Sequence, residues 1–229
     1  MLSDGREPGS ATMPTTAGDT SAADHRDYWE DFYRRKSAAV PPEPSQFARW
    51  VAGREQPGSV VVDMGCGTGR DSLWLARRGY RCIGLDYAAP AVQVAQDAAD
   101  ANGLGARFYQ ANLADSDNVE RIVDQVMGHG KPDVVYARFF VHAIDDDVRQ
   151  NLWSFAGSLL PAGGRLYAEF RTEPTVHEFG EHYRHFVPSD VVVGELQALG
   201  WEVLERLNGR GMAVYKHEDP VVCRLVARR

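Results

Sequence analysis

The stretch Asp63-Met64-Gly65-Cys66-Gly67-Thr68-Gly69 constrains this chain more than any other part of its sequence. It follows a β-branched run and precedes a helical pattern, so it lies where a strand turns into a helix. Three glycines at alternate positions remove the β-carbons that would keep a ligand away from the backbone and from the helix N-terminus. A tight turn also needs glycine, so the surrounding pattern must decide between a turn and a ligand site.

From residue 59 onward, short β-branched runs alternate with helical patterns, which predicts right-handed crossovers and a mainly parallel sheet. Strands are expected at 59–64, 81–86, 106–110, 133–137 and 164–171, and helices at 69–78, 90–102, 118–127 and 146–160. A further helix at 188–199 and strands at 201–207, 212–216 and 221–227 predict an antiparallel hairpin at one sheet edge. The fold class is therefore α/β, a Rossmann-like doubly wound sheet with helices on both faces.

The length of 229 residues fits one domain with a tail. Residues 1–24 are rich in small and polar residues and contain no aromatic residue, so we expect a disordered tail. Aromatic residues begin at Tyr28 and predict a helical cap within residues 25–50, which prolines 41, 42 and 44 interrupt. The single domain is expected to span residues 25–229.

The charge and the cysteines exclude several classes of protein. With 25 basic and 32 acidic residues the net charge is −7, which disfavours a nucleic-acid partner. No apolar run approaches the roughly 18 residues of a membrane span, and the N-terminus has no signal-peptide pattern, so we expect a cytoplasmic protein without a membrane partner. Three widely spaced cysteines argue against a disulfide framework and a cysteine-based zinc site.

Asp86 supports a ligand site at the glycine loop. It ends the second expected strand, 21 residues after Gly65, close to the roughly 20-residue spacing at which a carboxylate meets ribose hydroxyls. A capping or turn role is the alternative for this residue alone. A dinucleotide motif needs a small residue where this chain has Arg70, which disfavours NAD.

These residues together resemble the class I S-adenosylmethionine-dependent methyltransferases, whose D-x-G-x-G-x-G motif is matched by Asp63 to Gly69. The resemblance covers about residues 25–229. Stretch 67–72 and the aromatic segment look like the small-molecule branch, including thiopurine and tellurite methyltransferase-like enzymes. In that branch an N-terminal segment folds over the cofactor, whereas the plain alternative is that the aromatic residues only cover the sheet.

The resemblance implies a role for each matched residue. The loop would lie along the methionine end of S-adenosylmethionine, Asp63 would reach its amino group, Asp86 its ribose, and Tyr87 its adenine. Asn112 stands where the family commonly has an aspartate, and its amide oxygen accepts the same hydrogen bond. The predicted cofactor-binding residues are Tyr28, Tyr33, Asp63, Gly65, Cys66, Gly67, Arg70, Asp86, Tyr87, Asn112, Leu113 and Arg138.

The acceptor is expected beyond the fourth and fifth strands. His142 is the first candidate general base, with a structural histidine as the alternative, and His185 is the second. Arg138 holds either the cofactor carboxylate or an anionic substrate, unless it forms a packing salt bridge. Residues 172–187 are expected to form an acceptor lid. The predicted substrate-binding residues are Phe139, Glu169, Arg171, His182 and Arg184.

Asp145-Asp146-Asp147 is interpreted as the start of a helix and not as a metal site, and no metal is predicted. The chain also lacks the Asn/Asp-Pro-Pro-Tyr sequence that resembling enzymes acting on nucleic-acid bases or protein glutamine carry. The expected function is methyl transfer to an O, N or S atom of a small polar metabolite, in specialised metabolism, by a monomer or homodimer. The alternatives are a catalytically silent cofactor-binding sensor or scaffold and, less favoured, an NAD(P)-dependent oxidoreductase.

Deleting residues 1–24 should leave the melting temperature nearly unchanged, because a segment of this composition buries little apolar surface. Differential scanning calorimetry of the full and shortened chains measures this. A large fall in melting temperature would show that the segment is packed against the domain.

Overall fold

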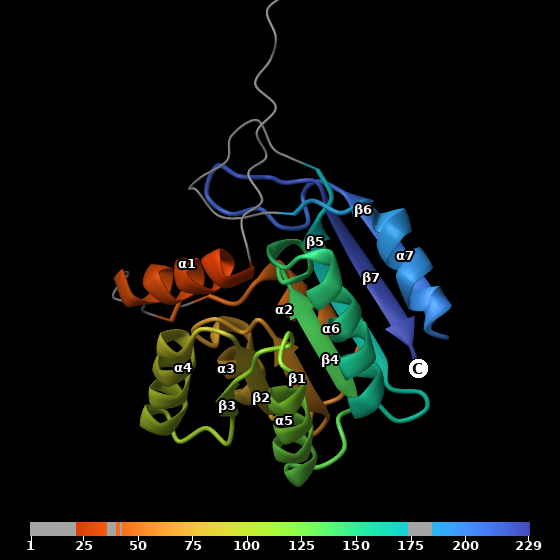
Figure 1. Cartoon of the computed structure of the whole chain (residues 1–229). Coiled ribbons are helices and arrows are strands. Elements are labelled where there is room, and N and C mark those ends of the chain that lie inside the picture. Colours follow the sequence, from red (N-terminus) through yellow and green to blue (C-terminus); the bar gives the residue numbers. More distant parts are fainter. Residues whose placement is uncertain (1–21, 36–39, 42, 174–184) are drawn as a thin grey trace, which may run out of the picture.

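The computed structural model describes residues 22–35, 40–41, 43–173 and 185–229, and within the first helix it describes the side chains of Tyr28 to Arg34. In this part of the chain seven strands form one sheet in the order β3-β2-β1-β4-β5-β7-β6 (Figure 1). They are β1 (Val60–Met64), β2 (Arg81–Asp86), β3 (Arg107–Gln110), β4 (Val134–Arg138), β5 (Arg165–Arg171), β6 (Glu202–Gly209) and β7 (Val222–Arg228).

The first five strands run parallel, and β7 pairs antiparallel with both β5 and β6. This arrangement confirms the predicted α/β sheet with an antiparallel hairpin edge. The helices are α1 (Ala22–Arg35), α2 (Gln46–Ala52), α3 (Arg70–Ala76), α4 (Ala89–Ala101), α5 (Ser116–Gly128), α6 (Asp146–Leu159), α7 (Ser189–Ala198) and the short 3-10 helix η1 (Val141–Ala143). None of the helices in the described ranges has the length and apolar character that crossing a bilayer requires.

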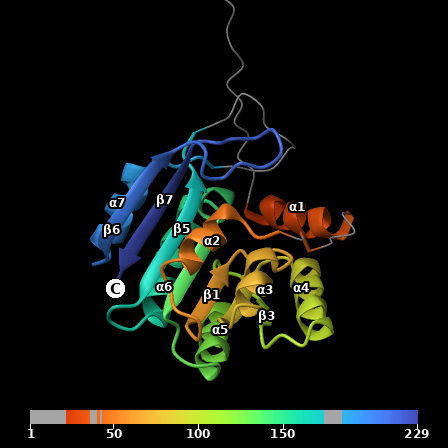
Figure 2. The same ribbon diagram turned by 180° about the vertical axis from the view of Figure 1, so that it is seen from behind.

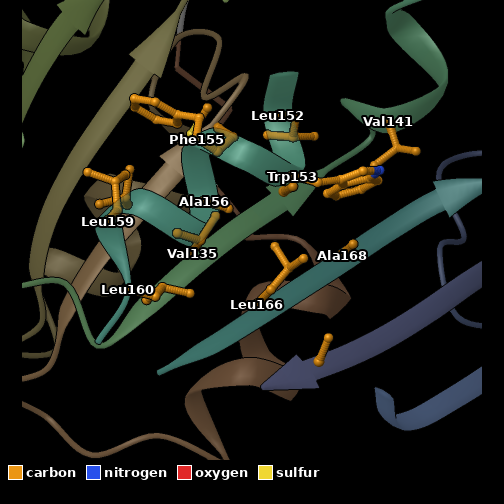
Figure 3. Close-up of a cluster of buried hydrophobic side chains, with 14 of the residues drawn as sticks. Val135, Val141, Leu152, Trp153, Phe155, Ala156, Leu159, Leu160, Leu166 and Ala168 are labelled. Atoms are coloured by element: carbon orange, nitrogen blue, oxygen red, sulfur yellow. The ribbon is translucent and has the colours of Figure 1, made fainter. Parts of the chain in front are cut away.

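The helices cover both faces of the sheet, and two apolar clusters fill the space between them and the strands. Alternate residues of each strand point to opposite faces, so Val62 and Val135 join one cluster while Val61 and Val134 join the other. Helices α5, α6 and α7 lie on the first face (Figure 1), and α2, α3 and α4 lie on the second (Figure 2). Trp153, fully buried on α6, packs in the first cluster above β4 and β5 (Figure 3).

Two local expectations differ from the structure. The strand expected at 212–216 is wrong: β6 pairs directly with β7 from Glu202↔Arg228 to Gly209↔Val222, so residues 210–221 form the connection between the paired ends. Within this connection Tyr215 and Glu218 form only an isolated bridge. The first helix begins at Ala22, so its first three residues lie within the predicted tail, and it extends the aromatic segment toward the N-terminus.

Asp71, the second residue of α3, joins three elements beneath the carboxyl ends of the strands. Its carboxylate accepts hydrogen bonds from the backbone N–H of Ser45 at 2.8 Å, from the Ser45 hydroxyl at 2.7 Å and from the Tyr136 hydroxyl at 2.7 Å. Ser45 is also the N-cap of α2, where its Oγ accepts from the Ala48 N–H at 2.9 Å. One buried carboxylate therefore holds α2 and β4 against the start of α3.

Replacing Asp71 with Ala should lower the stability of the domain by about 3 kcal/mol, because it leaves three buried donors without their acceptor. That corresponds to a fall in melting temperature of roughly 6–12 °C for a domain of this size. Calorimetry measures the shift, and Asp124→Ala on the exposed side of α5 is the matched control. Equal melting temperatures for the two variants would contradict the assigned role of Asp71.

Candidate active site

A cavity of about 710 Å³ lies beyond the carboxyl ends of β1, β2 and β4, where open parallel sheets bind their ligands. Its walls come from α1, the loop between β1 and α3, the ends of β2, β3 and β4, and the start of α6. Among the predicted cofactor-binding residues, those that line it are Tyr33, Asp63, Gly65, Cys66, Gly67, Arg70, Asp86, Tyr87, Asn112, Leu113 and Arg138.

The glycine loop forms one wall of this cavity in a backbone conformation that side chains disfavour. Gly65 has a φ of +69° and Gly67 a φ of +54°. A Cβ on Gly65 would lie 2.5 Å from Cδ2 of Phe140, and a Cβ on Gly67 would lie 2.7 Å from the Tyr33 hydroxyl oxygen. Both glycines therefore let aromatic side chains approach the loop, in addition to leaving its backbone open to a ligand.

Asp86 ties the end of β2 to this loop. Its Oδ2 accepts the N–H of Gly67 at 2.8 Å, and its Oδ1 accepts the N–H of Ala88 at 2.9 Å. Burial raises the pKa of Asp86, and the backbone donors Ala88, Gly67 and Tyr87 oppose that rise. A carboxylate has about four lone-pair sites, so the two oxygens keep capacity for hydroxyl donors from a ligand in the cavity.

Asp63, at the carboxyl-terminal half of β1, is the second carboxylate of the cavity. It is 3% exposed and accepts a hydrogen bond from the Ser72 hydroxyl at 2.6 Å. Burial is the main reason that the pKa of Asp63 is raised well above its usual value, and the Ser72 hydrogen bond opposes it. A cationic amino group placed here would stabilise the ionised form, so the residue fits an ammonium ligand.

Helix α1 contributes an aromatic wall. Trp29, Phe32 and Tyr33 line the cavity, and burial raises the pKa of the Tyr33 hydroxyl. Tyr28 does not line it: its ring stacks on Phe32 at a centroid distance of 6.4 Å. The predicted aromatic segment is thus brought to the cavity, with Trp29 and Phe32 closer to it than Tyr28.

Asn112 and Leu113 lie at the cavity end near Tyr87. The side-chain oxygen of Asn112 accepts the N–H of Ala114 at 3.0 Å, and the backbone N–H of Asn112 donates to Asn118 at 3.0 Å. These bonds fix the turn after β3, so the polar edge of this turn has a defined position in the cavity wall.

Arg138 is the cation at the end of β4, and Glu169 holds it. The paired register of β4, β5 and β7 puts Arg138, Glu169 and Arg224 in one row. Glu169 is fully buried and accepts from Nε of Arg138 at 3.1 Å and from Nε of Arg224 at 2.8 Å. The predicted substrate-binding residue Glu169 thus lies outside the cavity lining, and Arg138 combines a salt bridge with a position in the lining.

The two candidate bases are also outside the lining. His142 is 4% exposed, and its Nδ1 accepts the backbone N–H of Arg171 at 3.1 Å, as the structural alternative expects. The N–H of His185 donates to the backbone oxygen of His142 at 2.8 Å, and its Nε2 lies 2.9 Å from Asp146. Predicted residues His182 and Arg184, and with them most of the predicted lid, lie outside the described residues.

Phe139 lines the cavity as predicted for an acceptor-binding residue, whereas Arg171 does not. Sequence reasoning missed Tyr136, Asp71 and Phe140, which also contribute to the walls. Phe140 belonged to the stretch already placed at the end of the fourth strand, but no sequence pattern indicates that its ring covers Gly65. Asp145 is the N-cap of α6, and its side chain accepts a hydrogen bond from the Val148 N–H at 2.9 Å. Within the described ranges, no three His, Cys, Asp or Glu side chains are grouped in a way that could hold a metal ion.

Part of the chain is similar in sequence to known methyltransferases. Residues 61–164 match the family model of a methyltransferase domain. The chain is 32% identical over 127 residues to a 2-heptyl-1-hydroxyquinolin-4(1H)-one methyltransferase from Mycobacteroides abscessus, covering 47% of this chain and 53% of that protein. It is 31% identical over 126 residues to a thiopurine S-methyltransferase from Pseudomonas entomophila, covering 52% of this chain and 57% of that protein. The chain thus spans little more than half the length of these relatives.

The fold has close counterparts among solved structures. A SAM-dependent methyltransferase from Anabaena variabilis superposes with a TM-score of 0.70 over 92% of this chain and 96% of that one, at 19% identity. The chain therefore has the fold of these methyltransferases, and the segment that matches the methyltransferase-domain model, residues 61–164, contains the glycine loop, Asp86 and Arg138.

Substituting Gly67 with Ala should weaken binding of S-adenosylhomocysteine at least tenfold, because the new Cβ meets the Tyr33 hydroxyl at the cavity wall. Isothermal titration calorimetry measures the affinity. Gly103→Ala is the matched control: Gly103 also has a positive φ, +62°, but a Cβ there meets nothing within 4 Å. Both variants carry the left-handed strain of about 1 kcal/mol, so a similar loss in both would assign the effect to backbone strain.

Proposed function

We propose that this protein transfers the methyl group of S-adenosylmethionine to an O, N or S atom of a small polar acceptor. The observation that carries the proposal is the convergence of Asp63, the glycine loop and Asp86 on one cavity. Two relatives are named for small acceptors, a hydroxyquinolinone and thiopurines, which supports a small acceptor here. The absence of a basic excess in the sequence supports the same choice over a nucleic acid.

Each cavity residue takes one part of the cofactor in this proposal. Asp63 binds the amino group, Asp86 the ribose hydroxyls, and Arg138 the carboxylate. Tyr87, Asn112 and Leu113 form the adenine end, and the aromatic residues of α1 cover the molecule. The fit rests on the glycine loop in the cavity wall and on two carboxylates that line the cavity, the buried Asp63 and the half-buried Asp86.

The cofactor supplies a methyl group already activated by the positive sulfur, so the work of the chain is to position two reactants and exclude water. The buried residues of the wall and the aromatic side chains of α1 exclude water from the cavity. Phe139 and Phe140 line the wall on the expected acceptor side. His142 contributes by fixing the backbone of Arg171, and no general base is assigned to it.

Two features of the structure bear on the rival functions. Nε of Arg70 donates to the backbone oxygen of Glu43 at 2.6 Å and its side chain lines the cavity, where a dinucleotide would need a small residue. A silent cofactor-binding protein would share the cavity, so turnover must be measured separately from binding.

We also propose that the acceptor belongs to specialised metabolism, that the protein is cytoplasmic, and that residues 172–187 serve as an acceptor lid.

Replacing Asp86 with Ala should reduce the affinity for S-adenosylhomocysteine at least a hundredfold, because the ribose loses its acceptor and the loop loses the bond to Gly67. Isothermal titration calorimetry with the folded variant measures this, and Asp97→Ala on the exposed side of α4 is the control. An acceptor screen that detects S-adenosylhomocysteine formation then tests turnover. Unchanged affinity in Asp86→Ala would remove the ribose assignment, and binding without turnover across acceptor classes would favour the silent alternative.

A further inference from the structure

Arg171, the last residue of β5, is a buried cation whose hydrogen bonding is incomplete. It is 4% exposed, and one of its nitrogens, Nη2, donates to Glu218 at 2.6 Å. Its Nε and Nη1 are buried and have no hydrogen-bond partner among the residues that the structure describes. Buried donors are nearly always paired, because leaving one unpaired costs free energy. A ligand that supplies acceptor oxygens would remove this cost.

Phe139 connects Arg171 to the cavity. Its ring lines the cavity and lies 4.2 Å from Cζ of Arg138 and 5.4 Å from Cζ of Arg171, measured to the ring centroid. The ring face attracts both cations but offers no lone pair to their N–H groups. Phe139 therefore occupies the place from which an acceptor oxygen would reach Arg171.

The backbone of Phe139 is strained at this place. Its φ is +56°, a left-handed conformation that bulky residues rarely adopt, and its N–H donates to the backbone oxygen of Glu169 at 2.7 Å. Residues held in such conformations cluster at ligand-binding sites, where the surrounding structure maintains the strain. Phe139 thus combines backbone strain with a place in the cavity wall, and its ring lies beside the unpaired donors of Arg171.

Among the described residues, the ion pairs beside Phe139 contain more arginines than glutamates. Arg138, Arg171 and Arg224 contribute three positive charges, and Glu169 and Glu218 contribute two negative ones. Glu169 accepts from Arg138 with one carboxylate oxygen and from Arg224 with the other, so its charge is engaged by these two arginines. One further anionic group would balance the cluster.

We infer that the acceptor carries an anionic group, a carboxylate or a phosphate, which binds Arg171 after the Phe139 ring moves aside. The inference rests on the proposed function and names the substrate class of the same site. The anionic group anchors the acceptor and is not itself the methylated atom. Arg171 is in this role a specificity-determining residue, because its guanidinium forms stronger, charge-assisted hydrogen bonds with an anionic group than with a neutral oxygen.

The test uses the full chain saturated with S-adenosylhomocysteine and titrates it with benzoate, phenyl phosphate and neutral benzamide in a calorimeter. We expect benzoate or phenyl phosphate to bind at least tenfold more tightly than benzamide, and the tighter of the two identifies the anionic group. Arg171→Met should remove this preference, whereas Arg121→Met, which deletes an exposed cation on α5, should keep it. Equal binding of anions and benzamide, or an unchanged preference in Arg171→Met, would overturn the inference.

Phe139→Gly is the second variant, and it keeps the inference testable if Arg171→Met fails to fold. Glycine relieves the positive φ and removes the ring, so the preferred anion should bind at least threefold more tightly than to the unmodified protein. Equal or weaker binding would overturn the role of the ring. Intact binding of S-adenosylhomocysteine with no anion preference defeats only this inference, whereas failure to bind S-adenosylhomocysteine defeats the proposed function.

Discussion

The hydrogen bond from the Gly67 N–H to the Asp86 carboxylate is the contact on which the site depends. It crosses from the loop after β1 to the end of β2, two neighbouring parallel strands whose carboxyl ends meet at one sheet edge. Because Gly67 has no side chain, the Tyr33 hydroxyl also reaches the loop. The same carboxylate thus fixes the loop and faces the cavity, so loop geometry and ligand recognition share one group.

A second constraint comes from strand register. Pairing of β4 with β5 and of β5 with β7 lines up Arg138, Glu169 and Arg224, and their charges alternate across the row. Burial raises the pKa of Glu169, and the two arginines oppose that rise, which favours the ionised carboxylate. Glu169 accepts a hydrogen bond from the Nε of Arg138, and this bond fixes the position in which the arginine lines the cavity. The buried carboxylate of Glu169 on β5 therefore orients Arg138, a charge of the cavity wall on the neighbouring strand β4.

The sequence predicted the sheet better than it predicted the acceptor side. The expected strand at 81–86 coincides with β2, and the other parallel strands differ by about a residue at their ends, because β-branched runs between helical patterns have strong periodicity. The expected strand at 212–216 failed because only the tertiary pairing shows that β6 is already the partner of β7. His142 illustrates the same limit: its position after β4 was evident, but its hydrogen bond to Arg171 depends on a neighbour 29 residues away.

The sequence by itself determined the order of the elements, the glycine loop and the carboxylate one strand over, because these depend on local pattern and on fixed spacing between adjacent strands. Only the tertiary structure decided which charged side chains face the cavity. Glu169 and Arg171 share a face of β5, yet one is enclosed between two arginines while the other keeps two unpaired donors beneath Phe139. That distinction arises from cross-strand register and from contacts between segments far apart in the chain, which no local pattern encodes.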